Sequence, residues 1–170
     1  MLDKAIFQHL RSGHLLHIRQ GETLGVLGKP SSKAMQELGQ CHTEDPVILL
    51  PEQGLLQNYV QEVPELAWDL LEYSEKSLEL ILPQGRGLPQ YFLKEGFIAI
   101  RIEAKGEFHK MLYSMGSPLL LLRSPFQSDA SSFLSQDDKT LNLPAEFEWK
   151  IVPDKIIRLG LHGEIKFLKN

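Results

Sequence analysis

Short apolar runs recur along the whole chain, and segments with a helical period separate several of them. Runs this short are typical of buried strands, since helices need about twice the length. They lie at 14–18, 46–50, 77–82, 97–102, 118–122, 149–152, 156–160 and 164–168. Strands interleaved with helices predict an α/β fold, in which helices flank a twisted mixed sheet. The 170 residues can bury one substantial core, so we expect a single domain over 1–170.

Three segments between these runs predict helices. In 31–39, Ser32 can cap the first turn and Gly39 can end the helix. In 64–73, a proline stands at the helix start and apolar residues recur at i and i+4. The clearest pattern is 107–116, where apolar residues fall at i, i+3, i+4 and i+7 before a terminal glycine.

The last part of the chain predicts a loop and a hairpin. Residues 127–144 are rich in serine and aspartate, so we expect a long loop there. The final two apolar runs are separated by Leu161-His162-Gly163, which suits an antiparallel hairpin.

Charge and cysteine content narrow the classes of function. The net charge is −4, so the chain lacks the overall basicity of a dedicated nucleic-acid binder. The single cysteine, Cys41, cannot form an internal disulfide, which fits a reducing compartment. No apolar stretch approaches 18 residues, and the first residues lack the apolar core of a signal peptide. We therefore expect a cytoplasmic protein without a membrane partner.

One glycine-containing segment hints at a phosphate loop. The sequence GVLGKPS spans 25–31, but Pro30 stands where a Walker loop needs serine or threonine. Thr23 stands where the first glycine of that motif should be. A plain turn is the better interpretation of this segment.

Histidines and carboxylates offer little evidence of a reactive site. His9, His14 and His17 are near in sequence, but positions i and i+3 of a strand face opposite sides. Converging ligands are what a zinc site requires, so we expect no metal. Among the acids, Glu22 stands out because it follows a predicted strand directly.

Five segments, taken in order, carry a family resemblance. They resemble the YrdC/YciO family, whose best-known members, the threonylcarbamoyl-adenylate synthases, join threonine, bicarbonate and ATP for the modification of tRNA. The resemblance covers nearly the whole chain and implies a YrdC-like fold. The five segments are QGETLGVLG (20–28), ELGQCHTEDPVILL (37–50), FIAIRI (97–102), MGSPLLLLRSPFQSDA (115–130) and VPDKIIRLGLHGEIKFLKN (152–170).

The same resemblance places four signature side chains of the family on other residues. The family's Lys-x-Arg sets two cations against ATP phosphates and the acyl anion, and it falls on Gly39 and Cys41. The family's Ser-x-Asn supplies polar groups at a strand end, and it falls on Arg123 and Pro125. The reaction builds charge on phosphorus and on a carboxylate, so it needs those groups. We therefore expect no catalytic residues and no synthase activity.

Other family positions are retained or changed. The threonine that opens the first motif falls on Gly21, and the Ser-Thr of the closing motif falls on Asp154 and Lys155. The retained and strand-end positions form the ligand-binding candidates, and ATP is the ligand that the resemblance implies. The candidates are Glu22, Thr23, Arg101, Arg123 and Ser124.

Three functions are compatible with this pattern. The first is a divergent YrdC-like domain without synthase activity, which binds nucleotide, RNA or protein in the setting of tRNA modification or translation. The second is an enzyme with a rebuilt anion site around Arg123 and Arg101, with Lys29 nearby. The third is a domain that binds only a protein partner. The lost cations predict weak, salt-sensitive RNA binding in every case.

Arg123 poses the sharpest question, because it follows four leucines at a strand end. A guanidinium cannot be buried there without a partner. Glu44 or Asp45 could pair with it internally, or a bound anion could do so. We favour the internal pair, in which the arginine fills the pocket that would hold the ligand in the family.

Overall fold

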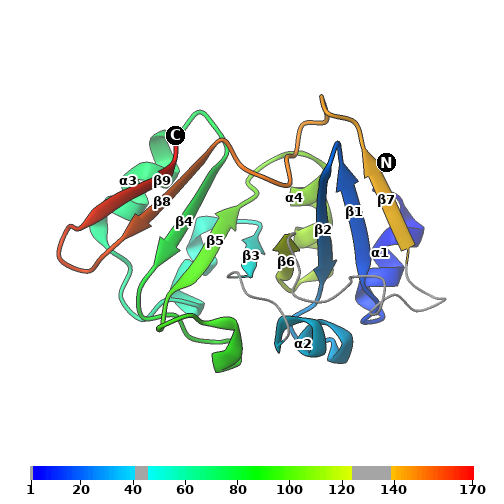
Figure 1. Cartoon of the computed structure of the whole chain (residues 1–170), viewed down its shortest axis with the longest axis horizontal. Helices are drawn as coiled ribbons and strands as arrows, with labels where there is room; N and C mark the ends of the chain where they lie inside the picture. Colours follow the sequence, from blue (N-terminus) through cyan, green and yellow to red (C-terminus); the bar gives the residue numbers. More distant parts are fainter. Residues whose placement is uncertain (1, 41–45, 124–138) are drawn as a thin grey trace.

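A computed structural model describes residues 2–40, 46–123 and 139–170 of the chain. In these ranges nine strands form one mixed sheet in the order β7-β1-β2-β6-β3-β5-β4-β8-β9, shown in Figure 1. The α/β class with a single mixed sheet and flanking helices is therefore confirmed. The strands are β1 Leu16–Gln20, β2 Thr23–Gly28, β3 Val47–Leu50, β4 Leu78–Leu82, β5 Ile98–Ile102, β6 Leu119–Arg123, β7 Lys139–Leu143, β8 Lys155–Leu159 and β9 Ile165–Lys169. The helices are α1 Lys4–Arg11, α2 Lys33–Gln40, α3 Glu65–Tyr73, α4 Gly106–Met115 and the 3₁₀ segments η1 Gln53–Asn58 and η2 Gln90–Phe92.

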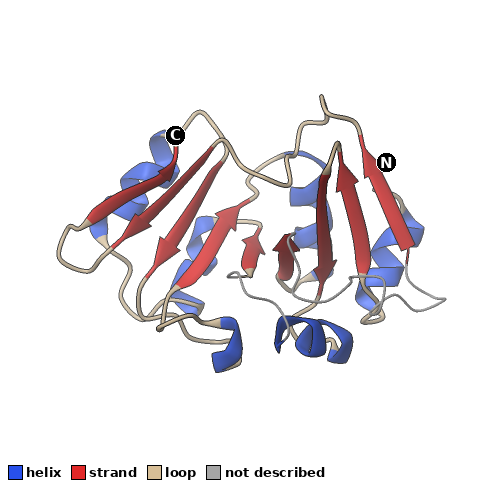
Figure 2. Ribbon diagram, viewed as in Figure 1, coloured by secondary structure: helices blue, strands red, loops and turns tan. Residues whose placement is uncertain are grey.

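The central strand β6 explains the run of four leucines. It pairs antiparallel with β2 at one edge and with β3 at the other, and all four leucines are fully buried. Leu119 and Leu121 pack in a cluster with α1 and α4, whereas Leu120 and Leu122 pack in a second cluster with α2 and α3. Successive side chains of a strand point to opposite faces, so helices cover both faces of the sheet. Figure 2 shows the helices around the strands.

Two of the predicted helix boundaries are confirmed and one is wrong. The Ser32 hydroxyl caps α2 by accepting a hydrogen bond from the Met35 backbone N–H at 3.3 Å. Gly116 ends α4 in the left-handed conformation, with φ of 70°. Gly39, however, does not end α2, which continues to Gln40. The contact of this glycine with Phe92 accounts for its presence inside the helix.

Three predictions about strands and loops are corrected. The predicted loop 127–144 contains β7, which is held in the sheet because Leu141 and Leu143 are buried and the strand pairs parallel with β1. The predicted turn at 25–31 contains most of β2, since apolar residues on both faces make it a central strand. The predicted strand 149–152 is irregular instead, and side-chain hydrogen bonds replace a ladder there.

The irregular segment is fixed by one glutamine at the end of β1. The Gln20 side chain donates to the carbonyls of Pro144 and Trp149, at 3.2 and 3.0 Å. Its amide oxygen accepts from the backbone N–H of Ile151 at 2.9 Å. Trp149 and Ile151 are thereby held in the core, where they pack beside β5 and α4. This anchored segment forms one wall of the site.

Candidate functional site

The site region lies where β5 ends and where β4 and α4 begin. A cavity of about 760 Å³ opens there, bounded also by the segment that Gln20 anchors. Its charged lining is balanced, with four basic and four acidic side chains, so it offers no excess of positive charge to a phosphate. The basic side chains are Lys76, Arg101, Lys105 and Lys150, and the acidic ones are Glu75, Glu103, Glu148 and Asp154.

Arg101, the arginine that the resemblance retains, is buried beneath this cavity with 2% exposure. One of its terminal nitrogens donates to the carbonyls of Lys150 and Ile151, at 2.8 and 3.1 Å. Its Nε lies 3.2 Å from a carboxylate oxygen of Glu103. The guanidinium therefore links β5 to the anchored segment through hydrogen bonds.

An aromatic stack completes the setting of Arg101. Its guanidinium lies over the ring of Trp149 at 4.9 Å, and that ring stacks on Phe108 of α4 at 4.1 Å. The indole N–H of Trp149 donates to Glu103 at 3.0 Å, so Glu103 serves both neighbours. Burial lowers the pKa of Arg101, and the charges of Glu103 and Glu79 act in the opposite direction.

Glu79 is the internal partner of Arg123. The guanidinium binds both carboxylate oxygens of Glu79, at 2.5 and 3.0 Å. Glu79 is 2% exposed and the Arg123 side chain 14% exposed. An internal carboxylate pair is therefore present, but its acid lies on β4, whereas Glu44 and Asp45 lie outside the described residues. The arginine on β6 reaches over the two intervening strands, β3 and β5, to make this bond.

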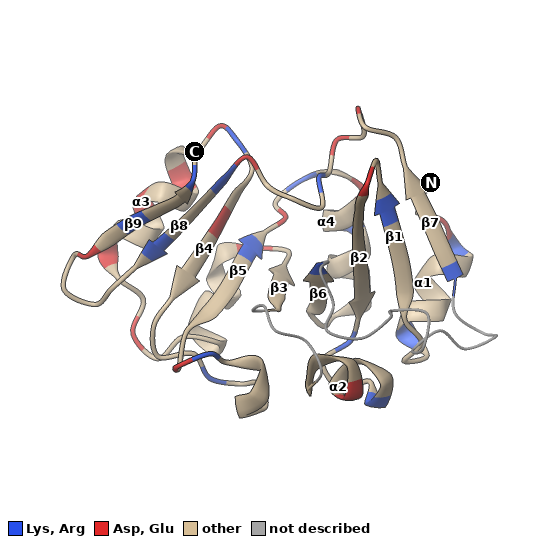
Figure 3. Ribbon diagram, viewed as in Figure 1, with Lys and Arg blue, Asp and Glu red and all other residues tan. Residues whose placement is uncertain are grey.

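The four charged groups form one row of neighbours, in which each side chain lies beside one of opposite charge. Glu79 stands directly opposite Arg101 in the β4–β5 pair, so both side chains lie on one face. Arg123 contacts Glu79 from one side, and Glu103 contacts Arg101 from the other. Figure 3 shows the acidic position on β4 beside the basic end of β5. The row Glu103–Arg101–Glu79–Arg123 is neutral as a whole.

Gly39, one of the replaced family positions, is a packing residue here. A Cβ at position 39 would lie 2.1 Å from Cε1 of Phe92, so the ring of η2 fills the space of any side chain. Phe92 is itself fully buried, which leaves it little room to move. A cation at this position would therefore meet the core before it reached solvent. Tight packing explains why a glycine stands inside α2.

The remaining sequence candidates are placed as follows. Glu22 is exposed and Thr23 half-buried, at the turn between β1 and β2 that Gly21 makes with φ of +64°. Thr23 shares a face with Gly25, which pairs with Arg123, so the threonine and the arginine lie on the same part of the sheet. Cys41, Ser124 and Pro125 lie outside the described residues.

At the family's closing motif, Asp154 directly precedes β8 and Lys155 is its first residue. The Asp154 carboxylate accepts hydrogen bonds from the hydroxyl and the backbone N–H of Ser77, at 3.0 and 3.3 Å. The bond from the Ser77 hydroxyl is the main reason that the pKa of Asp154 is lowered. Asp154 thus joins the starts of two parallel strands, β4 and β8.

Sequence reasoning missed Glu79, Gln20 and Trp149 as parts of this region. Glu79 could have been noticed, because an acid inside the apolar run at 77–82 needs a partner just as Arg101 does in its own strand. Among the residues that the structure describes, there is no cluster of three potential metal ligands. In the same ranges, no helix has both the length and the apolar character to cross a membrane.

Comparison with solved structures identifies the fold. E. coli YciO superposes with a TM-score of 0.67 at 16% identity, over 98% of this chain and 87% of that one. Sua5 of P. abyssi, complexed with L-threonine, gives a TM-score of 0.65 at 15% identity, over 91% of this chain. HypF in its phosphate- and nucleotide-bound form gives 0.60 at 12% identity, over 96% of this chain.

These likenesses define a class of protein by fold. The domain has a YrdC-like fold, as the order of its sequence motifs predicted. The chain spans about half the length of the Sua5 structures and about a quarter of HypF. No family model matches the sequence, and a sequence comparison with curated proteins finds no match.

Proposed function

We propose that this YrdC-like domain does not synthesise threonylcarbamoyl-adenylate and works instead as a binding module. The observation that carries the proposal is the bidentate bond from Arg123 to the buried Glu79. A synthase must offer cations to phosphate and acyl oxygens in the transition state. Here the arginine at the family's Ser-x-Asn position already holds a carboxylate of the same chain.

A second observation supports the proposal at the family's first cation position. Gly39 faces the buried ring of Phe92, so that position has no room for a lysine. Loss of one preorganised group costs about 10²–10³ in rate, and four signature groups are replaced. ATP binding at this face, implied by the resemblance, is correspondingly weakened.

The charge balance favours a protein partner over RNA. The described lining of the large cavity is neutral, and Glu79 neutralises Arg123. Nucleic-acid affinity depends on cations that neutralise phosphates, so we expect only weak and salt-sensitive RNA binding. A role near tRNA modification or translation is an inference from the resemblance, whereas a cytoplasmic location is the expectation drawn from the single cysteine.

An enzyme with a rebuilt anion site around Arg123 and Arg101 is the competing function, and one experiment separates the two. The purified chain is incubated with ATP, bicarbonate and L-threonine, with an active synthase of the family as positive control, and the adenylate is measured by chromatography. Calorimetric titration with ATP and with threonine accompanies the assay. We expect no product and no saturable heat. Product formation at an ordinary enzymatic rate contradicts the proposal, and tight ATP binding without product supports the rebuilt site.

A further inference from the structure

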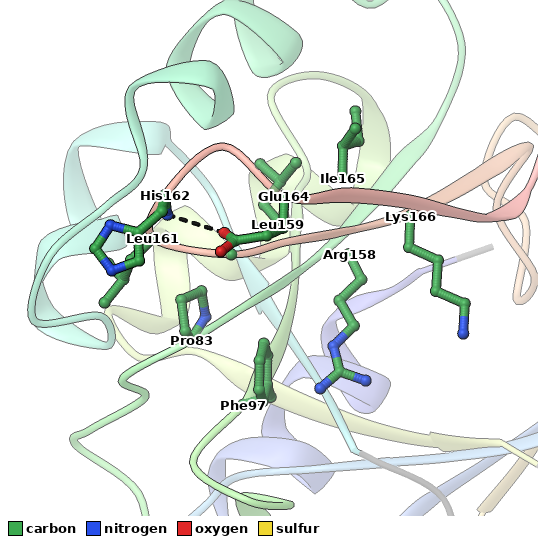
Figure 4. Close-up of a pocket in the computed structure, with 10 residues that line it drawn as sticks. Pro83, Phe97, Arg158, Leu159, Leu161, His162, Glu164, Ile165 and Lys166 are labelled. Carbon is green, nitrogen blue, oxygen red and sulfur yellow. Dashed lines mark hydrogen bonds between the residues drawn. The ribbon is translucent and has the colours of Figure 1, made fainter.

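We propose that a second pocket, at the β8–β9 hairpin, binds an organic anion that carries an apolar body. The pocket has a volume of about 430 Å³ and lies beside the ends of β4 and β8 and the start of β5. Cavities of this size accept small organic molecules. Figure 4 shows the residues on which the proposal rests: Pro83, Phe97, Arg158, Leu161 and Lys166.

Two cations face each other across this hairpin. Arg158 on β8 stands directly opposite Lys166 on β9, so their side chains share one face of the sheet. Figure 4 shows the two side chains extending in the same direction. Like charges directly opposite each other destabilise a strand pair. An anion between them would turn this unfavourable pair into a favourable one.

No carboxylate of the described chain neutralises this pair. Within the described residues, neither Arg158 nor Lys166 forms a salt bridge or a hydrogen bond through its side chain. The acid of the pocket is Glu164, whose carboxylate accepts a hydrogen bond from the His162 backbone N–H at 2.9 Å. The hydrogen bond from its own backbone N–H and the bond from His162 lower the pKa of Glu164, and they hold the ionised carboxylate at the turn.

The guanidinium is positioned before any ligand arrives. The Arg158 guanidinium carbon lies 3.9 Å from the centre of the Phe97 ring, which orients the guanidinium plane by cation–π attraction. An arginine fixed in this way loses less entropy when it binds an oxyanion. Arg123 differs in this respect, because its guanidinium already donates to both carboxylate oxygens of Glu79.

The apolar part of the lining defines the rest of the ligand. Pro83, Leu161 and the ring of Phe97 line the same pocket as the two cations. Inorganic phosphate would leave this apolar surface uncovered, whereas a carboxylate or sulfonate on a hydrocarbon or aromatic body would bury it. The chemistry therefore fits an amphipathic organic anion, with its oxygens between Arg158 and Lys166.

The test uses the full chain and the fluorescent anion 8-anilinonaphthalene-1-sulfonate, which combines a sulfonate with aromatic rings. We expect one saturable site. Arg158→Gln and Lys166→Gln should each raise the Kd about tenfold, because each removes a charge-assisted hydrogen bond. The matched control is Lys139→Gln, an exposed lysine on β7 at the opposite edge of the same sheet, which should leave the Kd unchanged.

Competition identifies the ligand chemistry. Decanoate should displace the fluorescent anion, and inorganic phosphate should not at equal concentration. Equal displacement by phosphate would overturn the apolar-body assignment. Absence of a saturable site, or equal weakening by Lys139→Gln, would overturn the pocket itself. Backbone amide NMR of the unmodified protein keeps the proposal testable if a variant misfolds, since shifts on addition of the anion must concentrate at 158–166 and at Phe97.

Discussion

Removal of the Arg123 guanidinium is the most direct test of the internal Arg123–Glu79 pair. In Arg123→Ala, the Glu79 carboxylate, which is 2% exposed in the unmodified protein, loses both of its bonds to the guanidinium. Breaking a buried ion pair from one side costs about 3–5 kcal/mol. Arg123 retains 14% exposure, and Arg101 still stands opposite Glu79, so we expect the lower part of that range or slightly less, about 2–3 kcal/mol.

The assay is thermal and urea unfolding, each with and without ATP or phosphate. For a domain of this length, about 2–3 kcal/mol corresponds to a fall in Tm of roughly 4–12 °C. Arg19→Ala is the matched control, because Arg19 is an exposed arginine on β1 of the same sheet. The control should change the free energy of unfolding by no more than about 0.5 kcal/mol.

A double-mutant cycle isolates the pair itself. Glu79→Gln should also destabilise the protein, and Arg123→Ala combined with Glu79→Gln should cost less than the sum of the two single changes. Neither ATP nor phosphate should alter the Tm of the unmodified protein or of Arg123→Ala. The reasoning is refuted if Arg123→Ala behaves like the Arg19→Ala control. It is also refuted if phosphate stabilises the unmodified protein and not Arg123→Ala, since the arginine would then be an anion-binding group.

Three further predictions concern packing, acid stability and RNA. Gly39→Ala should destabilise the protein by about 1–3 kcal/mol in urea unfolding, because the new Cβ meets Phe92, although alanine favours helix by about 1 kcal/mol. Phe92→Leu should recover part of the loss, and a stabilised Gly39→Ala would contradict this packing. Because the pKa of Asp154 is lowered, its bond to Ser77 contributes full stability above the ordinary aspartate pKa of about 3.9, and this stability is lost as pH falls through the lowered pKa. Asp154→Asn should therefore be less stable than the unmodified protein at pH 7 and equally stable in strong acid. A stability difference that grows in acid would contradict this prediction. Mobility-shift assays with tRNA at physiological salt should show little complex, whereas tight binding that resists salt would rule out the charge argument.

The sequence by itself determined the class of fold. The apolar runs at 46–50, 77–82, 97–102 and 118–122 became the strands β3, β4, β5 and β6, because runs of this length are typical of a sheet covered on both faces. The order of five motifs then specified the YrdC-like topology, which the structural likenesses confirm. Local signals also located the Ser32 cap and the Gly116 stop, since both depend on neighbouring residues alone.

The tertiary structure alone decided the state of the site. The partner of Arg123 is 44 residues away in sequence and three strands away in the sheet, so strand order had to be known before Glu79 could be assigned. Gly39 read as a helix stop from its neighbours, whereas its contact with Phe92 gives it a packing role. The strand β7 and the irregular segment at Trp149 depend in the same way on distant partners, β1 and Gln20. Burial and pairing across the sheet are nonlocal, so residue patterns could predict that Arg123 needs a partner but not which residue supplies it.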